Sequence, residues 1–291
     1  MECILNQVDP QFDAAQGVQY RLSILLCQDG FSFLVTDADS QKILKLLSYK
    51  SANSDLQHRD LDGWPATGKE YFGEFKNNGF TEIAWQRVDI AIASRKITVA
   101  PEVFLKNGED YGLMSAAHSV SEDEEILTEP VFDLGPVIAI AAPRYLAEYG
   151  SKLFPAASLH CAPAIFVKGL LREHSNLISR QVFINVYHGY FEIAVIQGLR
   201  LIYLNSFRYL APSDVLYYVI FVLEQLGFVP SEENVTLMGE ISENEIIYNQ
   251  LKMYCGSLQT AAGPDIMDYG ETFNEIALHR HYTLFNIPLC E

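Results

Sequence analysis

Hydrophobic and polar residues alternate along two neighbouring segments near the start of the chain. The segments flank a Gln28-Asp29-Gly30 turn, and their alternating apolar residues are Leu22, Ile24, Leu26, Phe31, Phe33 and Val35. A period of two on both sides of Asp-Gly predicts a β-hairpin. A further apolar run at 43–47 fits a strand or a short helix. We expect a strand, because only a few residues separate this run from the hairpin.

The same alternation returns between Gln181 and Gly239. Turns at His188-Gly189 and Gln197-Gly198 separate three predicted strands, which cover 182–186, 191–195 and 199–206. A short strand is predicted later in this stretch, over 235–238.

A helix is predicted over 212–226, since Pro212 suits the first helical position and Gly227 suits the cap that ends the helix. Apolar residues lie on every side of this helix, which predicts that it is buried on both sides. We therefore expect Tyr217 and Tyr218 to pack in the core, although aromatic residues at a partner surface are the alternative. Downstream, Ser242 and Glu245 fit a capping box for a helix that ends at Gly256.

The second half of the chain thus reads strand, strand, strand, helix, strand, helix, and the first half opens with the same three strands. This order predicts a duplicated α/β architecture with mixed sheets covered by helices. We expect two domains, over 1–177 and 178–291, with a small α+β subdomain inserted in the first at about 121–162. The other elements expected in the first half are helices over 68–78, 143–149 and 163–174, a short helix opened by Pro101, strands over 88–93, 97–99, 136–141 and 159–161, and solvated loops over 51–67 and 110–125.

Composition and charge limit the classes of partner. The residues are 49% hydrophobic and 20% charged, which is typical of a globular protein, and the net charge of −17 opposes nucleic acid and anionic membranes. No run approaches the roughly 18 to 20 apolar residues of a membrane span, and we expect no signal peptide in MECILNQVDP. Five scattered cysteines without CxxC spacing fit a reducing compartment, so we expect a cytoplasmic location.

The strand and helix order matches the ribonuclease-H-like unit that the actin, sugar-kinase and heat-shock chaperone superfamily uses twice. Residues 137–173 and 183–214 resemble the cytoplasmic actin-like proteins of type IV pilus and type II secretion assembly. Residues 18–290 resemble still more an uncharacterised bacterial family of the same fold. The residues that carry this second resemblance are Leu22 to Phe33 (LSILLCQDGFSF), Asn205-Ser206-Phe207, Asp214 with Tyr217-Tyr218, and Leu289-Cys290. The resemblance implies a duplicated ribonuclease-H-like, actin-like ATPase fold, and no known reaction.

ATPases of this superfamily hold Mg²⁺ and phosphates with an Asp-x-Gly turn in each domain. The resemblance places Gly30, Gly189 and Gly239 at a nucleotide cleft, but Gln28 and Tyr187 stand at the two aspartate positions. Asp29 is one position off, and strand alternation would point it to the opposite face. Glu240 follows Gly239 where the adenosine loop has a second small residue. The three glycines therefore mark a degenerate cleft that we expect to lack ATP hydrolysis, whereas binding of ATP and Mg²⁺ without hydrolysis stays open.

Other candidate chemistry is weaker. His279 and His281 would share a face only on a strand, and Leu278, Tyr282 and Phe285 favour a helix, so we expect no metal site there. His188 is expected to be a surface turn residue, with proton transfer as the alternative. For a ribonuclease-type nuclease, which needs several strand carboxylates, the second half offers mainly Glu192. Cys27 is expected to be a buried thiol rather than a nucleophile.

Three hypotheses follow. The first is a catalytically silent actin-like protein, or pseudo-ATPase, that acts as a cytoplasmic scaffold with a protein partner. The second is an ATPase or small-molecule kinase that uses displaced acids such as Asp29 or Glu240, and it requires both carboxylates to converge on an open cleft between the domains. The third is an adaptor of a pilus- or secretion-type assembly.

Overall fold

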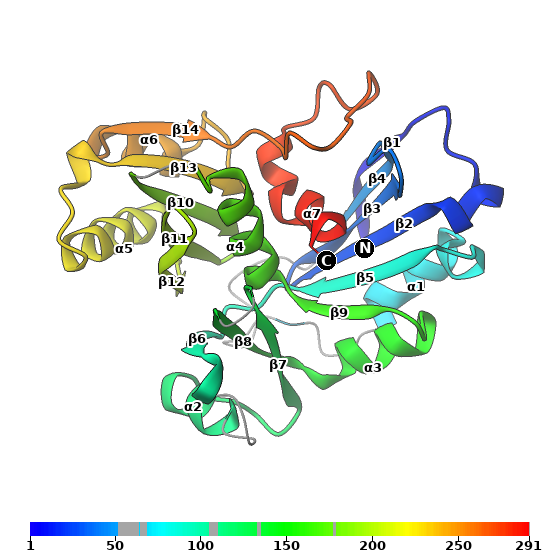
Figure 1. Ribbon diagram of the computed structural model, residues 1–291, viewed down its shortest axis with the longest axis horizontal. Coiled ribbons are helices and arrows are strands. Elements are labelled where there is room, and N and C mark those ends of the chain that lie inside the picture. The colour runs from blue at the N-terminus through cyan, green and yellow to red at the C-terminus, as the bar shows by residue number, and fades with distance from the viewer. Residues whose placement is uncertain (52–63, 65–68, 105–109, 133–134, 177–178, 291) are drawn as a thin grey trace.

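The computed structural model describes residues 1–51, 64, 69–104, 110–132, 135–176 and 179–290. This part of the chain forms two large sheets and one small sheet, and helices α4 (Ala162–Glu173) and α7 (Tyr282–Asn286) lie between the large ones (Figure 1). The expected loop over 51–67 lies almost wholly outside the described residues.

The first large sheet has six strands in the order β1-β4-β3-β2-β5-β9. Strands β2, β3 and β4 form an antiparallel meander with β1 added at its edge, whereas β5 and β9 run parallel to β2. The expected hairpin and the choice of a strand for the third apolar run are both confirmed. The strand bounds are β1 Glu2–Val8, β2 Tyr20–Cys27, β3 Gly30–Asp37, β4 Ile43–Lys50, β5 Arg87–Ile92 and β9 Ser158–Cys161.

The second large sheet repeats this topology, in the order β12-β11-β10-β13-β14. Its first three strands are antiparallel, and β13 and β14 run parallel to β10. The duplicated ribonuclease-H-like architecture expected from the sequence is confirmed. The strand bounds are β10 Arg180–Tyr187, β11 Tyr190–Gln197, β12 Arg200–Arg208, β13 Asn234–Gly239 and β14 Ser257–Thr260.

Helices cover both faces of the first sheet, which explains why its central strands are apolar at nearly every position. On one face Phe33 packs edge-to-face against Phe75 of α1 (Lys69–Asn77), with ring centroids 4.7 Å apart. Helix α3 (Arg144–Leu153) contributes buried Leu146 to the same cluster. On the opposite face Leu25 and Leu34 pack in a cluster with Phe285 of α7.

The small sheet, β6-β8-β7, contains strands β6 (Ile97–Pro101), β7 (Glu124–Pro130) and β8 (Pro136–Pro143). The expected solvated loop over 110–125 holds only for 118–123, because the rest of this segment forms helix α2 (Asp110–Ala117) and the start of β7. The buried carboxylate of Glu124 lies 2.8 Å from the ammonium of Lys96, so one residue of the acidic run there forms a buried ion pair. The strand expected near 159–161 exists as β9, which pairs with β5 of the first large sheet.

Helix α5 (Pro212–Gln225) covers one face of the second sheet together with α6 (Ile246–Tyr254). The expected burial on both sides of α5 is wrong. Val215 and Val219 are buried, whereas Tyr217 is 63% exposed and Phe221 is 45% exposed. Tyr218 has intermediate exposure, and its ring stacks on Phe207 of β12. Core packing is thus correct for Tyr218 and wrong for Tyr217.

The chain returns to the first sheet after β14. Helix α7 packs against α4, β2 and β3, and the 3-10 turn η7 (Ile287–Leu289) packs against β2 and β5. Arg21 of β2 donates to the carbonyl of Pro288 at 2.8 Å. The helix expected around 278–285 is confirmed as the 3-10 turn η6 (Leu278–His281) followed by α7.

The predicted capping box before α6 is wrong in one respect. Glu245 is itself the residue at the helix cap, and the Ser242 hydroxyl donates a hydrogen bond to its carboxylate at 3.0 Å.

The described part of the chain contains no helix with both the length and the apolar character needed to cross a bilayer.

Candidate functional site

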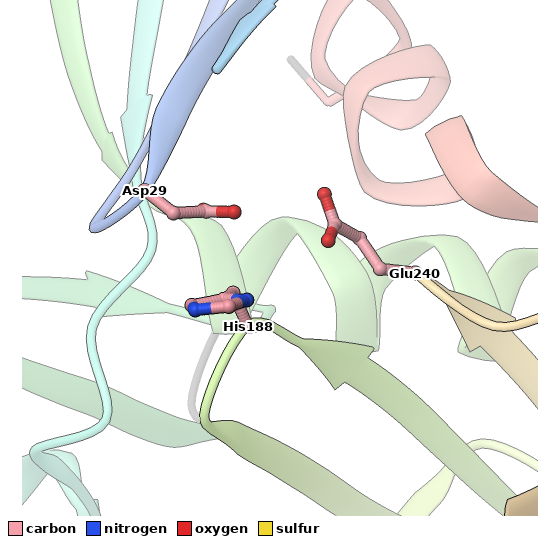
Figure 2. Close-up of side chains that lie close together, drawn as sticks. All are labelled: Asp29, His188 and Glu240. Atoms are coloured by element: carbon pink, nitrogen blue, oxygen red, sulfur yellow. The ribbon is translucent and has the colours of Figure 1, made fainter. Parts of the chain in front are cut away.

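Three turns from the two large sheets meet at one point. Asp29 lies in the turn after β2, His188 in the turn after β10, and Glu240 directly after β13. Because β13 runs parallel to β10, the last two turns share one sheet edge. Figure 2 shows the three side chains pointing toward one another, and their ligand atoms all lie within 4.8 Å of one another.

The position of Asp29 differs from the sequence prediction. Residues 28 and 29 form the turn itself, so strand alternation does not set the direction of this side chain. Asp29 faces the second sheet instead of pointing away from it. His188 lies in a turn as expected, but it is half-buried and faces the two carboxylates.

A cavity of about 750 Å³ adjoins this point and is lined by both large sheets and the segment before α7. Gly30, Gly239 and Tyr187 line it, together with Asp29 and Glu240. Gly189 is not among the lining residues in the described chain, and lies in the β10–β11 turn with φ of 80°. The structure therefore brings two of the three predicted cleft glycines to the cavity.

Each of these two glycines has a reason in its own backbone environment. A Cβ on Gly30 would lie 2.0 Å from the carbonyl oxygen of Tyr49, on the neighbouring strand. Gly239 has φ of +81°, and a Cβ there would lie 2.1 Å from the carbonyl oxygen of Val186. Both positions require glycine so that protein backbone can approach. A role for these glycines in holding a nucleotide remains a prediction.

Lys50, at the end of β4, joins the two sheets across the cavity. Its ammonium lies 2.6 Å from Oε2 of Glu240 and 3.8 Å from Oδ2 of Asp29. Partial burial and the charge of Asp29 raise the pKa of the Glu240 carboxyl, although Lys50 opposes this shift. Lys50 was not predicted from the sequence, because a lysine at the end of a strand carries no signal by itself.

Asp29 is the least satisfied member of this group. Its side chain is 7% exposed, and Oδ2 accepts no hydrogen bond from any residue that the structure describes. Buried carboxylate oxygens normally have hydrogen-bond partners, since desolvation without one is costly. The ammonium of Lys50, 3.8 Å from Oδ2, offsets the negative charge of Asp29 without donating a hydrogen bond to that oxygen.

Behind the cavity, a buried polar network occupies the place where the superfamily's second turn would have an aspartate for Mg²⁺. Tyr187 stands at the aspartate position, stacks on Tyr190 with ring centroids 4.7 Å apart, and accepts a hydrogen bond from Asn185 at 2.9 Å. Asn185 also donates to Glu192 at 3.2 Å. Burial raises the pKa of the Glu192 carboxyl to about 8, so this group carries a proton at neutral pH.

Two further predicted candidates, His279 and Cys27, are not members of this group. His279 is in η6, where Nε2 lies 2.7 Å from the carbonyl oxygen of Ile241. Cys27 ends β2 at the cavity wall, and burial raises the pKa of its thiol, which fits an unreactive side chain.

A second cluster with the same residue types lies where β5, β7, β9 and α4 meet. His160 bridges Asp89 at 3.0 Å and Glu129 at 3.2 Å, and Lys168 contacts Glu129 at 2.5 Å. The backbone N–H of Cys161 donates to Glu129 at 2.7 Å, and Arg87 pairs with Asp89 at 2.9 Å. Despite its burial, the two carboxylates raise the pKa of His160 to about 9.

Comparison with known proteins supplies the family. A family model described as "Protein of unknown function (DUF3822)" matches residues 9–258, and the chain belongs to this family. A Bacteroides thetaiotaomicron structure, described as an actin-like ATPase fold of unknown function, matches with 21% identity and a TM-score of 0.76. It covers 86% of this chain and 94% of that chain. A structure of the PilM-PilN type IV pilus biogenesis complex matches with 10% identity and a TM-score of 0.60, over 92% and 96% of the two chains. No curated protein matches the chain.

These structural likenesses show the actin-like ATPase fold. They confirm the fold class and the resemblance drawn from residues 18–290. At such identities they carry no activity or partner to this chain.

Proposed function

We propose that this DUF3822 protein is a catalytically silent actin-like protein that acts in the cytoplasm as a protein-interaction scaffold. The observation that carries the proposal is the ion pair between Lys50 and Glu240, which spans the cavity between the two sheets at 2.6 Å. The superfamily resemblance implies that an ATPase of this fold holds phosphate and Mg²⁺ in this region. Here it holds a lysine and a glutamate that neutralise each other.

The residues around the cavity fit a magnesium nucleotide poorly. The open sides of Gly30 and Gly239 face protein backbone, so they offer no free cradle for phosphates. Tyr187 is packed and hydrogen-bonded where an aspartate would hold Mg²⁺ or its water. Among the residues that the structure describes, four carboxylates and two strong bases line the cavity. The excess of negative charge would repel a triphosphate. These side chains are Asp29, Glu240, Glu271 and Glu275, and Lys50 and Arg280.

A partner surface supports the scaffold part of the proposal. Tyr217 and Phe221 stack with ring centroids 6.2 Å apart on the outward face of α5, and both are substantially exposed. Exposed aromatic residues are enriched at protein interfaces. With a net charge of −17, the protein would attract a basic partner.

The test is a calorimetric titration of the purified protein with ATP and Mg²⁺, combined with an assay of phosphate release. We expect no binding in the micromolar range and no turnover. A double variant, Lys50→Ala with Glu240→Gly, removes the ion pair and places a second small residue after Gly239. The wild-type protein is compared with this variant. Micromolar binding together with turnover by the wild-type protein would refute the proposal.

One observation favours a second candidate, an ATPase or small-molecule kinase that uses displaced acids. Asp29 and Glu240 converge on the cavity between the domains, as that hypothesis requires. If such activity exists, Asp29→Asn and Glu240→Gln should each abolish it, whereas Asp39→Asn, at an exposed turn, should leave it unchanged. Turnover that survives both cleft variants would dismiss the candidate.

The third hypothesis, an adaptor of a pilus- or secretion-type assembly, remains a prediction. The likeness to the PilM-PilN structure supports it through the fold alone. It predicts a membrane-protein partner, and an affinity capture that recovers only soluble proteins would count against it.

A further inference from the structure

We propose that Asp29, His188 and Glu240 form a binding site for a divalent transition-metal ion, with Zn²⁺ as the best-matched metal, and that the ion binds without a nucleotide. The site would join the first sheet to the second. This inference is independent of the proposed scaffold role, since a metal can hold two domains together in a protein with or without catalytic activity.

The donor set supports this chemistry. One imidazole nitrogen and two carboxylate oxygens are common zinc ligands, with bonds of about 2.0–2.2 Å. Ligands of a tetrahedral ion with such bonds lie roughly 3.4 Å apart. The donor atoms lie within 4.8 Å of one another, so the side chains must close by up to roughly 1.4 Å. Glu240, with a side chain 38% exposed, has room to make this movement.

The second, independent observation is the state of Asp29. Its side chain is more than nine-tenths buried, points at the other two ligands, and has an oxygen to which no described residue donates a hydrogen bond. A bound cation would satisfy this oxygen directly. The burial of an unsatisfied acceptor is otherwise unfavourable.

Lys50 is the competitor for the same carboxylates. Its ammonium approaches both of them, which shows that the position attracts positive charge. The side chain is 35% exposed, so it can turn into solvent when a metal displaces it. Metal binding therefore replaces the ammonium of Lys50 with a divalent ion at the two carboxylates.

The experiment is a titration of tag-free, chelator-treated protein with Zn²⁺ alone, and separately with Co²⁺ as a spectroscopic probe. We expect one Zn²⁺ per chain. Asp29→Asn and His188→Gln should each weaken binding by about tenfold or more, and Lys50→Met should strengthen it several-fold. Asp39→Asn, a matched change at an exposed turn, should bind like the wild type.

Binding would also raise the melting temperature, because the ion binds only the folded site. Equal affinities for Asp29→Asn and Asp39→Asn would overturn the proposal. A strong near-ultraviolet thiolate band with Co²⁺ would do so too, since it would assign the metal to a cysteine such as Cys27 or the exposed Cys3. Melting of each variant without metal shows whether it folds, and ATP is left out so that failure here is distinct from failure of the scaffold proposal.

Discussion

Two clusters in this protein contain the same four residue types and are built differently. In the interior cluster Asp89, Glu129, His160 and Lys168 form a chain of contacts between 2.5 and 3.2 Å. In the cleft cluster Asp29, Glu240, His188 and Lys50 converge with one close ion pair and one unsatisfied carboxylate oxygen.

The difference separates a structural network from a candidate ligand site. The interior cluster lies between the small sheet, the first large sheet and α4, and Glu129 receives bonds from His160, Lys168 and a backbone N–H. A group satisfied in this way has no coordination left to offer a ligand. The cleft cluster keeps such capacity at Asp29, and it borders a cavity.

The largest expected effect is the loss of Glu129. Glu129→Gln should lower the free energy of unfolding by about 3 kcal/mol, because it leaves two partly buried cations without their shared partner. Glu240→Gln should change it by less than about 1 kcal/mol, since that side chain is 38% exposed. Urea unfolding at neutral pH measures both values. Equal losses of unfolding free energy in the two variants would contradict the distinction between a structural cluster and a ligand site.

A pH dependence should come next in size. The folded state raises the pKa of His160 from about 6.5 to about 9, so the stabilisation from its protonated form is complete below pH 6.5 and is lost as pH rises through 9. We expect a loss of about 3 kcal/mol across this window in urea midpoints. His160→Gln should flatten the profile, whereas His188→Gln should keep it. A steep profile in His160→Gln would contradict the assignment.

The smallest effects concern the two lysines. Lys168→Met should cost about 2 kcal/mol, because Lys168 bonds a largely buried carboxylate at 2.5 Å. Lys50→Met, measured without metal, should change stability by less than about 1 kcal/mol, since both side chains of its ion pair are partly exposed to solvent. Thermal melting of both variants checks the order. A larger loss for Lys50 would make the cleft ion pair structural.

Much of the fold was predictable because local patterns agree with the final structure. Alternation with Asp29-Gly30 and His188-Gly189 turns predicted both hairpins, and the order of elements predicted the duplication. The errors arose where a residue far along the chain decides the outcome. Glu124 is buried by Lys96, 28 positions away, so its acidic neighbourhood alone suggested a loop. The face of α5 that carries Tyr217 is exposed instead of packing on the sheet.

The candidate site was less predictable for the same reason. The sequence indicated Gly30 and Gly239, and it singled out Asp29, His188 and Glu240 one at a time. Their convergence depends on three turns from two sheets, and on the register that sets where each strand ends. Neither Lys50 nor the unsatisfied oxygen of Asp29 leaves a mark in local sequence.

The contact between Arg21 and Pro288 links residues 267 positions apart, because α7 and η7 cover one face of the first sheet. During synthesis the part of that face under α7 and η7 stays uncovered until the ribosome has made the second sheet and the segment after it. The first sheet therefore cannot complete its core before the chain is almost fully made. Since long-range closure slows folding, nascent chains should expose the apolar surface of this face until then.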